Sequence, residues 1–404
     1  MGRGRPIKRW PPAFPLAASL KGAVLAAPLF FSGAAFAMQQ DPHLPDTLEQ
    51  TAFADLKGWA EDDHAAALAG FLRFCRNPAS DKGGMSADDF RHLCQLAEDS
   101  AGGSSTDARR FFETRFTPFK FAGNGFVTGY FEPEVAASRQ RTGTYRVPLL
   151  KKPEGLEPAA ATNRPANWPA ELSHGRRIGG TLKEMPDRGA IMDGALDGEG
   201  LELAYLADPV DAFFIHVQGS ARLRLSDGSV MRVGYAGKTG HPYTGIGRLL
   251  VERGEGSPED FTMAGLRKWL KDHPDRRDAL LRQNRSFIFF REVTETAPDE
   301  GPVGAAGLPL VAGRSLAVDA DHIPYGAMVF VSAGFSDWQH GNKTFARLMV
   351  ADDTGSAIKG PARGDIFAGS GEKAGAIAGE IRHSAEFTVL VPNVAVGNPA
   401  VPTD

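Results

Sequence analysis

Three aspartates crowd into one glycine-rich stretch near the end of the chain, VADDTGSAIKGPARGDIF, residues 350–367. Asp352 and Asp353 end an apolar run that is typical of a strand, and Asp365 opens the next such run after a turn-rich loop. A strand–loop–strand of this length can return on itself and bring Asp353 close to Asp365. Two neighbouring carboxyl groups raise one pKa, which keeps a carboxylic acid protonated as a general acid. Spacing alone leaves two hypotheses open, a catalytic acid and a turn whose acids only shape the loop.

A second acidic group lies upstream in SLAVDADHIPYGAMVFV, where Asp319, Asp321 and His322 stand together. The pattern D-x-D-H is weak evidence for a metal, because further ligands would have to converge from elsewhere. The loop after Asp353 also lacks the alternating acids and closing glutamate of a calcium-binding EF-hand. We therefore predict no metal site, and we expect the acids around Asp319 to shape a turn and hold a loop.

Two further motifs could bind a sugar. GYFEPE sets Tyr130 and Phe131 beside two acids, and aromatic faces pack against sugar rings, although the residues alone favour a strand with two core aromatics. FFIHVQGSARLRL places Gln218, Gly219 and Ser220 at a predicted strand-to-strand junction. Amide, hydroxyl and exposed backbone groups there would suit a neutral polyol ligand, and a glycine bulge in a β-ribbon is the alternative.

Nucleotide and nucleic-acid binding are both disfavoured. GYAGKTGHPYTGIG is rich in glycine, but it lacks the phosphate-binding G-x-x-x-x-G-K-[ST] pattern and follows no strand–G-x-G-x-x-G–helix arrangement. The chain of 404 residues has a formal net charge of -4, so it offers no electrostatic attraction for nucleic acid. No cofactor is predicted.

The pattern of apolar residues predicts the elements that must position these motifs. Helical spacing extends from about residue 48 to 115, and residues 150–200 are rich in proline and glycine, as in surface loops. Residues 200–235 have a strong strand signal that includes a hairpin around SDGS. Two helical segments follow, TGIGRLLVERG and TMAGLRKWLKDHP, and Pro274 should end the second. Residues 308–396 contain short strands between glycine turns and one short helix, KAGAIAGEI.

The N-terminus predicts export. A basic segment, MGRGRPIKRW, precedes the apolar GAVLAAPLFFSGAAFA, which ends in an A-x-A site before Met38, as in a cleaved signal peptide. No cysteine follows the apolar stretch at once, so we expect no lipid anchor. The two cysteines, Cys75 and Cys94, lie in helical segments, with Ser86 as the start of the second. In an oxidising compartment we expect them to form one disulfide, with two buried free thiols as the alternative.

Taken in order, the motifs resemble a known family. A signal peptide, GYFEPE, FFIHVQGSARLRL, GYAGKTGHPYTGIG, NRSFIFF, AVDADHIPYG and DDTGSAIKGPARGDIFAGSG follow one another as in MltA-type membrane-bound lytic transglycosylases, over roughly residues 110–390. The last block resembles the 3D domain, whose three aspartates match Asp319, Asp353 and Asp365. Where that family usually reads DTGGAIKG, this chain reads DTGSAIKG, with Ser356 at a glycine position.

The resemblance implies a mainly β protein with N-terminal helices. It implies a double-psi β-barrel, a second β-rich domain inserted into it, and a groove between the two that holds a peptidoglycan strand. The implied segments are a signal peptide (1–37), the N-terminal helical region with the start of the barrel (38–134), the inserted MltA domain (135–288), the rest of the barrel as the 3D domain (289–396) and a disordered tail (397–404).

The resemblance also implies a peptidoglycan lytic exotransglycosylase, a lyase that acts without water. It would cleave the β-1,4 bond between N-acetylmuramic acid and N-acetylglucosamine and leave 1,6-anhydro products. Asp365 would act as general acid and then base, with Asp353 as its supporting carboxylate. The residues implied in substrate binding are Tyr130, Phe131, Gln218, Gly219, Ser220 and Asp319. We expect a periplasmic monomer whose partners are glycan strands and cell-wall synthesis or division proteins.

Two other functions are compatible with the same motifs. A muramidase-type hydrolase would need a second catalytic acid, for which Glu132 is the candidate. A peptidoglycan-binding protein without activity would bind the cell wall and release no soluble fragments.

Overall fold

The computed structural model describes residues 48–77, 85–297, 299–341 and 343–395. The predicted signal peptide and C-terminal tail lie outside these residues. Among the helices of the described part, none combines the length and apolar character needed to cross a bilayer.

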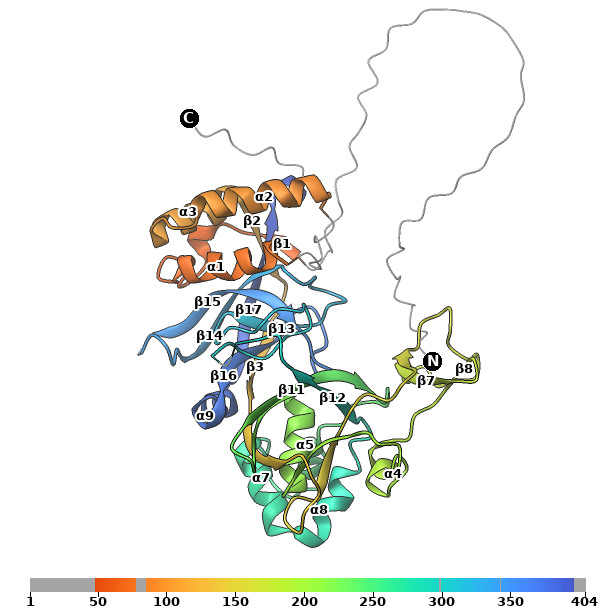
Figure 1. Cartoon of the computed structure of the whole chain (residues 1–404). Coiled ribbons are helices and arrows are strands. Elements are labelled where there is room, and N and C mark those ends of the chain that lie inside the picture. The colour runs from red at the N-terminus through yellow and green to blue at the C-terminus, as the bar shows by residue number, and fades with distance from the viewer. Residues whose placement is uncertain (1–47, 78–84, 298, 342, 396–404) are drawn as a thin grey trace, which may run out of the picture. The chain divides into compact units, whose positions relative to one another are not determined.

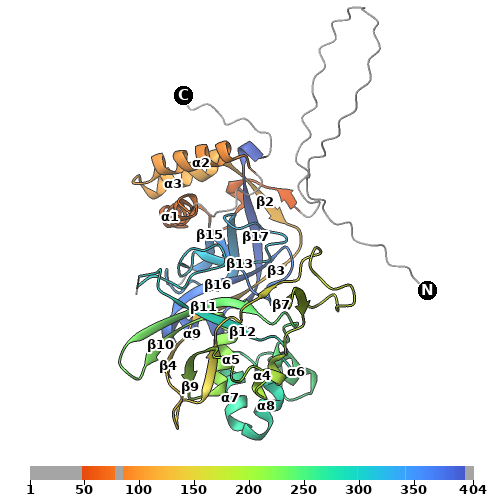
Figure 2. The same cartoon turned by 45° about the vertical axis from the view of Figure 1, so that its right-hand side comes forward.

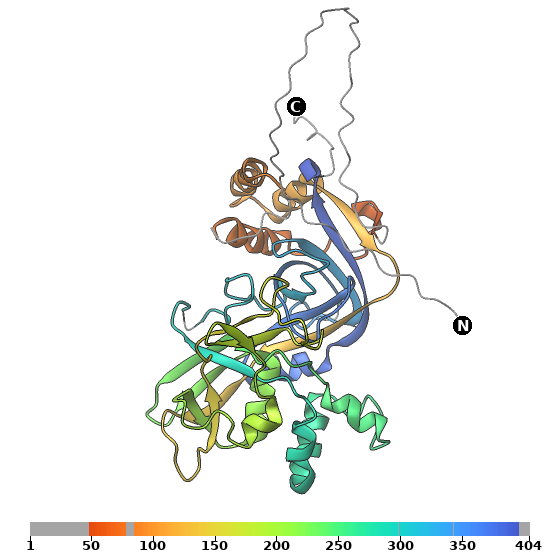
Figure 3. The same cartoon turned by 90° about the vertical axis from the view of Figure 1, so that its right-hand side faces the viewer.

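Six strands close into a barrel in the order β17-β14-β15-β13-β16-β3, because β3 pairs back onto β17. Figure 3 shows these strands curving round into a ring. Two of the pairings, β13 with β15 and β16 with β3, are parallel. The strands are β3 (Gly125–Glu132), β13 (Ser315–Val318), β14 (Met328–Ser336), β15 (Thr344–Asp353), β16 (Arg363–Ser370) and β17 (Arg382–Pro392). This closed ring is consistent with the double-psi barrel that the resemblance implies.

Alternating apolar side chains fill the barrel, among them Val127, Leu316, Val329, Phe345 and Ile366. Short strands β1 (Leu48–Gln50) and β2 (Phe116–Phe121) extend the sheet beyond β17. Helix α9 (Gly371–Glu380) packs closely on β3, since a Cβ at Gly129 would lie 2.8 Å from the Cα of Ala378. The turn η2 (Asn393–Ala395) follows β17.

Three N-terminal helices pack on the barrel, as the helical spacing predicts (Figure 1). They are α1 (His64–Cys75), α2 (Ala87–Ser100) and α3 (Ser105–Arg115), preceded by the short turn η1 (Phe53–Asp55). Ser86 is the N-cap of α2, where its side chain accepts a hydrogen bond from Asp89 N. Cys75 and Cys94 form a disulfide that joins the end of α1 to α2, with their Cα atoms 5.6 Å apart.

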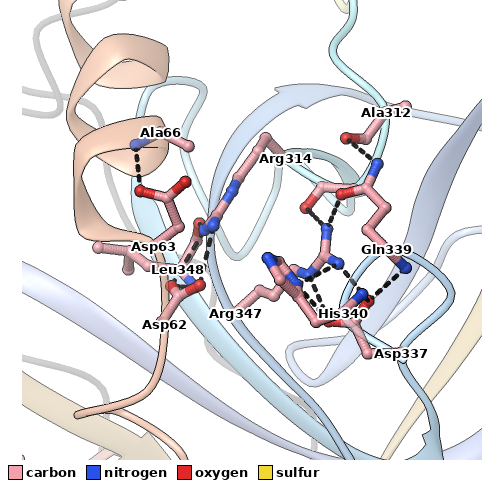
Figure 4. Close-up of polar contacts among 11 residues, drawn as sticks. Asp62, Asp63, Ala66, Ala312, Arg314, Asp337, Gln339, His340, Arg347 and Leu348 are labelled. Carbon is pink, nitrogen blue, oxygen red and sulfur yellow. Dashed lines mark hydrogen bonds and ion pairs between the residues drawn. The ribbon is translucent and has the colours of Figure 1, made fainter. Parts of the chain in front are cut away.

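Two buried ion pairs fasten loops to the barrel (Figure 4). Arg314 donates to both carboxylate oxygens of Asp62, at 2.8 and 3.0 Å, and Leu348 N donates to Asp62 as well. Arg347 donates to Asp337 in the same two-pronged way. Because Asp62 lies just before Asp63, the N-cap of α1, the first pair fixes the start of the helical layer against β15.

A second sheet holds six strands in the order β12-β11-β10-β4-β9-β5 (Figure 2). They are β4 (Glu134–Ser138), β5 (Val147–Leu150), β9 (Glu202–Leu206), β10 (Ser220–Leu225), β11 (Val230–Lys238) and β12 (Ile288–Val293). The predicted hairpin around SDGS is confirmed, because β10 and β11 pair antiparallel. Since β12 belongs to this sheet, the second lobe extends past the expected boundary at residue 288.

Short elements complete the second lobe. Residues 150–200 contain a small three-stranded sheet and one short helix, in agreement with the predicted loops and short elements. These are β6 (Leu156–Pro158), β7 (His174–Ile178), β8 (Thr181–Lys183) and α4 (Arg188–Met192). Helices α6 (Ile246–Glu252) and α7 (Met263–Asp272) occupy the two predicted helical segments.

One prediction about local structure is wrong. Residues 209–218 form helix α5 (Pro209–Gln218) and not a strand, because Asp208 caps the helix, Pro209 opens it and Gly219 ends it. The apolar run between those signals is buried, so its periodicity does not separate helix from strand. The prediction that Pro274 ends the second helical segment is confirmed, because α7 ends at Asp272; Pro274 also opens a further helix, α8 (Pro274–Leu281).

Removing the Arg314 guanidinium should destabilise the protein strongly. Arg314→Met leaves the Asp62 carboxylate buried without its cation, and such a loss costs about 3–5 kcal/mol. Arg76→Met is the matched control, since Arg76 and Glu98 form an exposed pair that contributes at most about 1 kcal/mol. Urea unfolding measures both free energies, and equal losses would contradict a structural role for the buried pair.

Candidate active site

Asp353 and Asp365 lie on either side of one small residue in the barrel wall. Strand β13 runs between β15 and β16, and Ala317 is in register with Asp353 on one side and Asp365 on the other. Two inter-strand spacings place the two backbones roughly 10 Å apart. Ala317 itself is buried, and it packs in one cluster with Tyr130 and Phe367.

Asp365 is a buried carboxyl group that accepts a hydrogen bond from a neighbouring hydroxyl group. Its Oδ1 accepts a hydrogen bond of 2.7 Å from Thr128 Oγ1, and Arg363 Nη2 donates to the same threonine oxygen at 2.7 Å. Burial raises the pKa of Asp365 to about 6, against the lowering effects of the Thr128 hydrogen bond and the Arg363 charge. A carboxyl group with this pKa can donate a proton and take one back near neutral pH.

Asp353 is held by hydrogen bonds on both oxygens. Tyr130 OH donates to Oδ2 at 2.7 Å, and Ala305 N donates to Oδ1 at 3.0 Å. Burial raises the pKa of Asp353, while these donors lower it. The charge of Asp353 in turn adds to the raised pKa of Asp365. The geometry suits a supporting carboxylate, because the hydrogen bonds on its two oxygens hold it in a fixed position.

Asp319 anchors the loop that joins the other two aspartates. Its oxygens accept from Lys359 Nζ at 3.1 Å and from Gly360 N at 2.9 Å. Burial would raise the pKa of Asp319, but these two donors lower it overall. The structure therefore agrees with the expected role of Asp319 in holding this loop. Within the described residues, no three ligating side chains gather as they would around a metal ion.

Asp352 points away from Asp353, as alternation along a strand requires. Its side chain is buried and accepts a hydrogen bond of 2.6 Å from Ser315 Oγ. Burial holds the pKa of Asp352 well above its ordinary value. The three acids of the opening stretch thus occupy three different environments.

Tyr130 and Phe131 do not form an exposed aromatic wall. Both are buried, Tyr130 against Leu310 and Phe367, and Phe131 against the alanines of α9. The prediction that their faces pack on sugar needs correction, because neither ring has an open face. Tyr130 instead reaches across two strands to hold Asp353, which gives it an indirect role.

Gln218, Gly219 and Ser220 occupy a helix-to-strand junction, where a strand-to-strand junction was expected. Gly219 adopts φ 82° to end α5, a conformation that favours glycine. Gln218 Oε1 accepts a hydrogen bond from Phe131 N at 2.9 Å, so this side chain joins the second lobe to β3 of the barrel. Ser220 is buried at the start of β10. The motif therefore has a joining role in addition to any contact with a ligand.

Glu132 is an ion-pair centre between the two lobes. It lies at the end of β3, where the chain leaves the barrel, and it is completely buried. Arg222 Nε and Arg232 Nε each lie 2.9 Å from its carboxylate, and Ser370 Oγ donates at 2.7 Å. Both arginines also bind the carbonyl oxygen of Glu300, on the second connecting segment. A carboxylate paired in this way is a poor candidate for the second acid of a hydrolase.

Comparison with known proteins decides the family. Residues 126–291 match the MltA specific insert domain, and residues 314–391 match the 3D domain. The membrane-bound lytic murein transglycosylase A of Escherichia coli K12 is 34% identical over 280 residues, which is 68% of each chain. The chain belongs to the MltA family.

Solved structures of MltA-type proteins share the fold. A membrane-bound lytic murein transglycosylase from Agrobacterium tumefaciens is 42% identical, with a TM-score of 0.79 over 87% of this chain and 99% of that one. MltA from Neisseria gonorrhoeae is 34% identical, with a TM-score of 0.69 over 86% and 92%. MltA of Escherichia coli with bound chitohexaose is 27% identical, with a TM-score of 0.64 over 87% and 96%.

This MltA-family chain also places residues beside the aspartates that sequence reasoning missed. Lys238 Nζ, at the end of β11, donates to Ser356 Oγ in the loop between β15 and β16, at 3.1 Å. Burial raises the pKa of Tyr243, and the negative charge of Asp365 raises it further, so the two groups lie within electrostatic reach. Lys238 and Tyr243 both lie in the glycine-rich motif that was rejected as a nucleotide site.

Thr128 and Arg363 were missed as well. Strand alternation was the available signal, since Thr128 and Tyr130 share one face of β3, as do Arg363 and Asp365 on β16.

Replacing Arg363 should raise the pKa of Asp365 above about 6. The guanidinium favours the ionised carboxyl group, so Arg363→Met makes deprotonation harder and shifts the titration to higher pH. Arg382→Met is the matched control. Arg382 is in register with Thr128, but its guanidinium donates to the Pro258 carbonyl oxygen. Carboxyl-carbon NMR titration measures the shift, and a downward or equal shift in both variants would contradict the assigned environment.

Proposed function

We propose that the protein cleaves peptidoglycan glycan strands as a lytic transglycosylase, with Asp365 as its one acid and base. The observation that carries the proposal is the difference between the two carboxyl groups: burial raises the pKa of Asp365 to about 6, whereas hydrogen bonds on both oxygens hold Asp353 in place. An ordinary glycosidase needs a second carboxylate that is free to act as nucleophile or base. A transglycosylase does not, because the sugar supplies its own nucleophile.

The reaction follows from the different roles of Asp365 and Asp353. Asp365 protonates the glycosidic oxygen while the bond from that oxygen to the anomeric carbon of N-acetylmuramic acid breaks. The C6 hydroxyl of the same sugar forms a new bond to the anomeric carbon, and Asp365 takes up the hydroxyl proton. The products are a 1,6-anhydro end and a free N-acetylglucosamine end, no water is consumed, and Asp365 returns to its protonated form.

Asp353 and Tyr130 support this acid. A negative charge at Asp353 opposes ionisation of Asp365 and favours positive charge that develops at the anomeric carbon. Tyr130 fixes that carboxylate from within the barrel wall. Gln218 and Ser220 lie close to the strand that bears Thr128, so we assign the Gln218–Ser220 segment to one side of the glycan site.

We further propose that the lobe between β4 and β12 is an inserted domain, close to the expected range 135–288, and that the enzyme works in the periplasm. Strand pairing supports the first point, because the barrel resumes only at β13. The predicted signal peptide and the family's cell-wall substrate support the second.

Asp365→Asn should abolish turnover and preserve folding. An amide cannot supply the proton, and the loss of general acid catalysis lowers the rate by at least about 10²–10⁴-fold. Digestion of purified sacculi followed by mass spectrometry measures the release of anhydro muropeptides. Asp321→Asn is the matched control, because Asp321 lies two residues after Asp319 and has no assigned role in the reaction. Full activity of Asp365→Asn, or hydrated reducing ends from the native enzyme, would refute the proposal.

The hydrolase alternative predicts a different result at Glu132. In the proposed mechanism, Glu132→Gln weakens the ion-pair centre between Arg222 and Arg232, so it lowers the melting temperature and leaves the product chemistry unchanged. If Glu132 were a catalytic acid, the folded variant would lose its activity and a small amine or carboxylate nucleophile could restore it. Product analysis together with thermal unfolding separates the two outcomes.

A further inference from the structure

Three lysines from three segments gather beside the loop that joins the aspartates. Lys238 ends β11, and its ammonium group donates to Ser356 Oγ. Lys359 lies in the same loop as Ser356 and pairs with Asp319. Lys152 packs over the strand that bears Lys238, since its Cδ lies 3.5 Å from a Cβ built at Gly237. This lysine cluster therefore includes residues of both lobes.

The charge of Lys238 is not balanced within the cluster, although Lys359 is paired with Asp319. Burial lowers the pKa of Lys238, and the charge of Lys359 lowers it further. The pKa of His174 is lowered to about 4 by burial and then by the charges of Lys238 and Lys152. In the described residues, the hydrogen bond of the Lys238 ammonium goes to a neutral hydroxyl, and no carboxylate pairs with it. A half-buried cation beside other cations binds an anion favourably, because the anion relieves the repulsion and the desolvation together.

We propose that Lys238, with Lys359 and Lys152, forms a subsite for a carboxylate carried by the muramyl residue of the glycan strand. The proposal rests on the proposed function. The backbone of the strand is neutral, and its negative charge lies on the lactyl ether of N-acetylmuramic acid or on the peptide attached there. A cation next to the aspartates would therefore distinguish muramyl strands from neutral chitin-type oligosaccharides, which have the same β-1,4 linkage.

The side chain of Ser356 holds the Lys238 ammonium group in place before a ligand binds. Here the hydroxyl positions the Lys238 ammonium across the two lobes in the free protein. A carboxylate can replace this neutral acceptor, because a charge-assisted hydrogen bond is about twice as strong as a neutral one.

Binding measurements test the subsite directly. The Asp365→Asn variant serves as the background, so that no ligand is cleaved, and calorimetry gives the dissociation constants. The ligands are chitohexaose, peptide-free muramyl oligosaccharides with the lactyl carboxylate, and the same oligosaccharides with their peptides. Lys238→Met should weaken binding of the muramyl ligands by about tenfold, the loss expected for one charge-assisted hydrogen bond. Its affinity for chitohexaose should stay within about twofold, and this also verifies the fold.

Two matched variants control for charge and position. Lys238→Arg keeps the positive charge and should retain muramyl affinity, whereas Lys120→Met removes a charge from β2, where Lys120 pairs with Glu386, and should change nothing. A loss that already appears with peptide-free strands identifies the lactyl carboxylate as the ligand. A loss confined to peptide-bearing strands identifies the peptide. Equal losses for all three ligands, or no loss, would overturn the subsite.

The two proposals fail separately. If the native enzyme releases no anhydro products but Lys238→Met still weakens muramyl binding selectively, the transglycosylase reaction is wrong and the subsite stands. If anhydro products form and Lys238→Met binds every ligand as well as its parent, the subsite is wrong and the reaction stands.

Discussion

The ion-pair centre at Glu132 is the constraint on which the rest of the site depends. The chain leaves the barrel directly after Glu132, and the two arginines that hold this carboxylate belong to the second sheet. The same arginines hold the second connection through the carbonyl oxygen of Glu300. Both passages between the lobes are therefore fixed by one buried cluster. Glu132 and Arg232 are both buried, so loss of the Glu132 carboxylate would leave the Arg232 guanidinium buried without its anion, and this cost resists any change in the relation of the lobes.

This fixed relation lets residues of the inserted lobe act on an acid of the barrel. Asp365 lies in the barrel wall, where burial raises its pKa to about 6. Tyr243 and Lys238 approach from the other lobe, one within the electrostatic reach of Asp365 and the other bound to the loop that leads to it. A single barrel could supply the acid, but it could not surround a long glycan strand with charge from two sides.

Sequence reasoning succeeded where local signals and chemistry agreed. The hairpin around SDGS, the cap at Ser86, the pairing of Cys75 with Cys94 and the order of the family motifs each depend on nearby residues. It failed where burial on all sides hid the period of an apolar run, as in α5. There the Asp208–Pro209 start and the Gly219 stop were stronger evidence than the strand-like composition.

By itself, the sequence determined the family, the mainly β architecture and the aspartates that are candidates for catalytic acids, because these follow from residue types and their order. The tertiary structure alone decided which role each acid can have. Asp353 and Asp365 are distinguished by hydrogen-bond partners on other strands, Asp319 by the loop it anchors, and Asp352 by its buried face. The position of Tyr130 beneath Asp353 and of Lys238 across from Ser356 also required the fold, since pKa and reach depend on neighbours that lie far away along the chain.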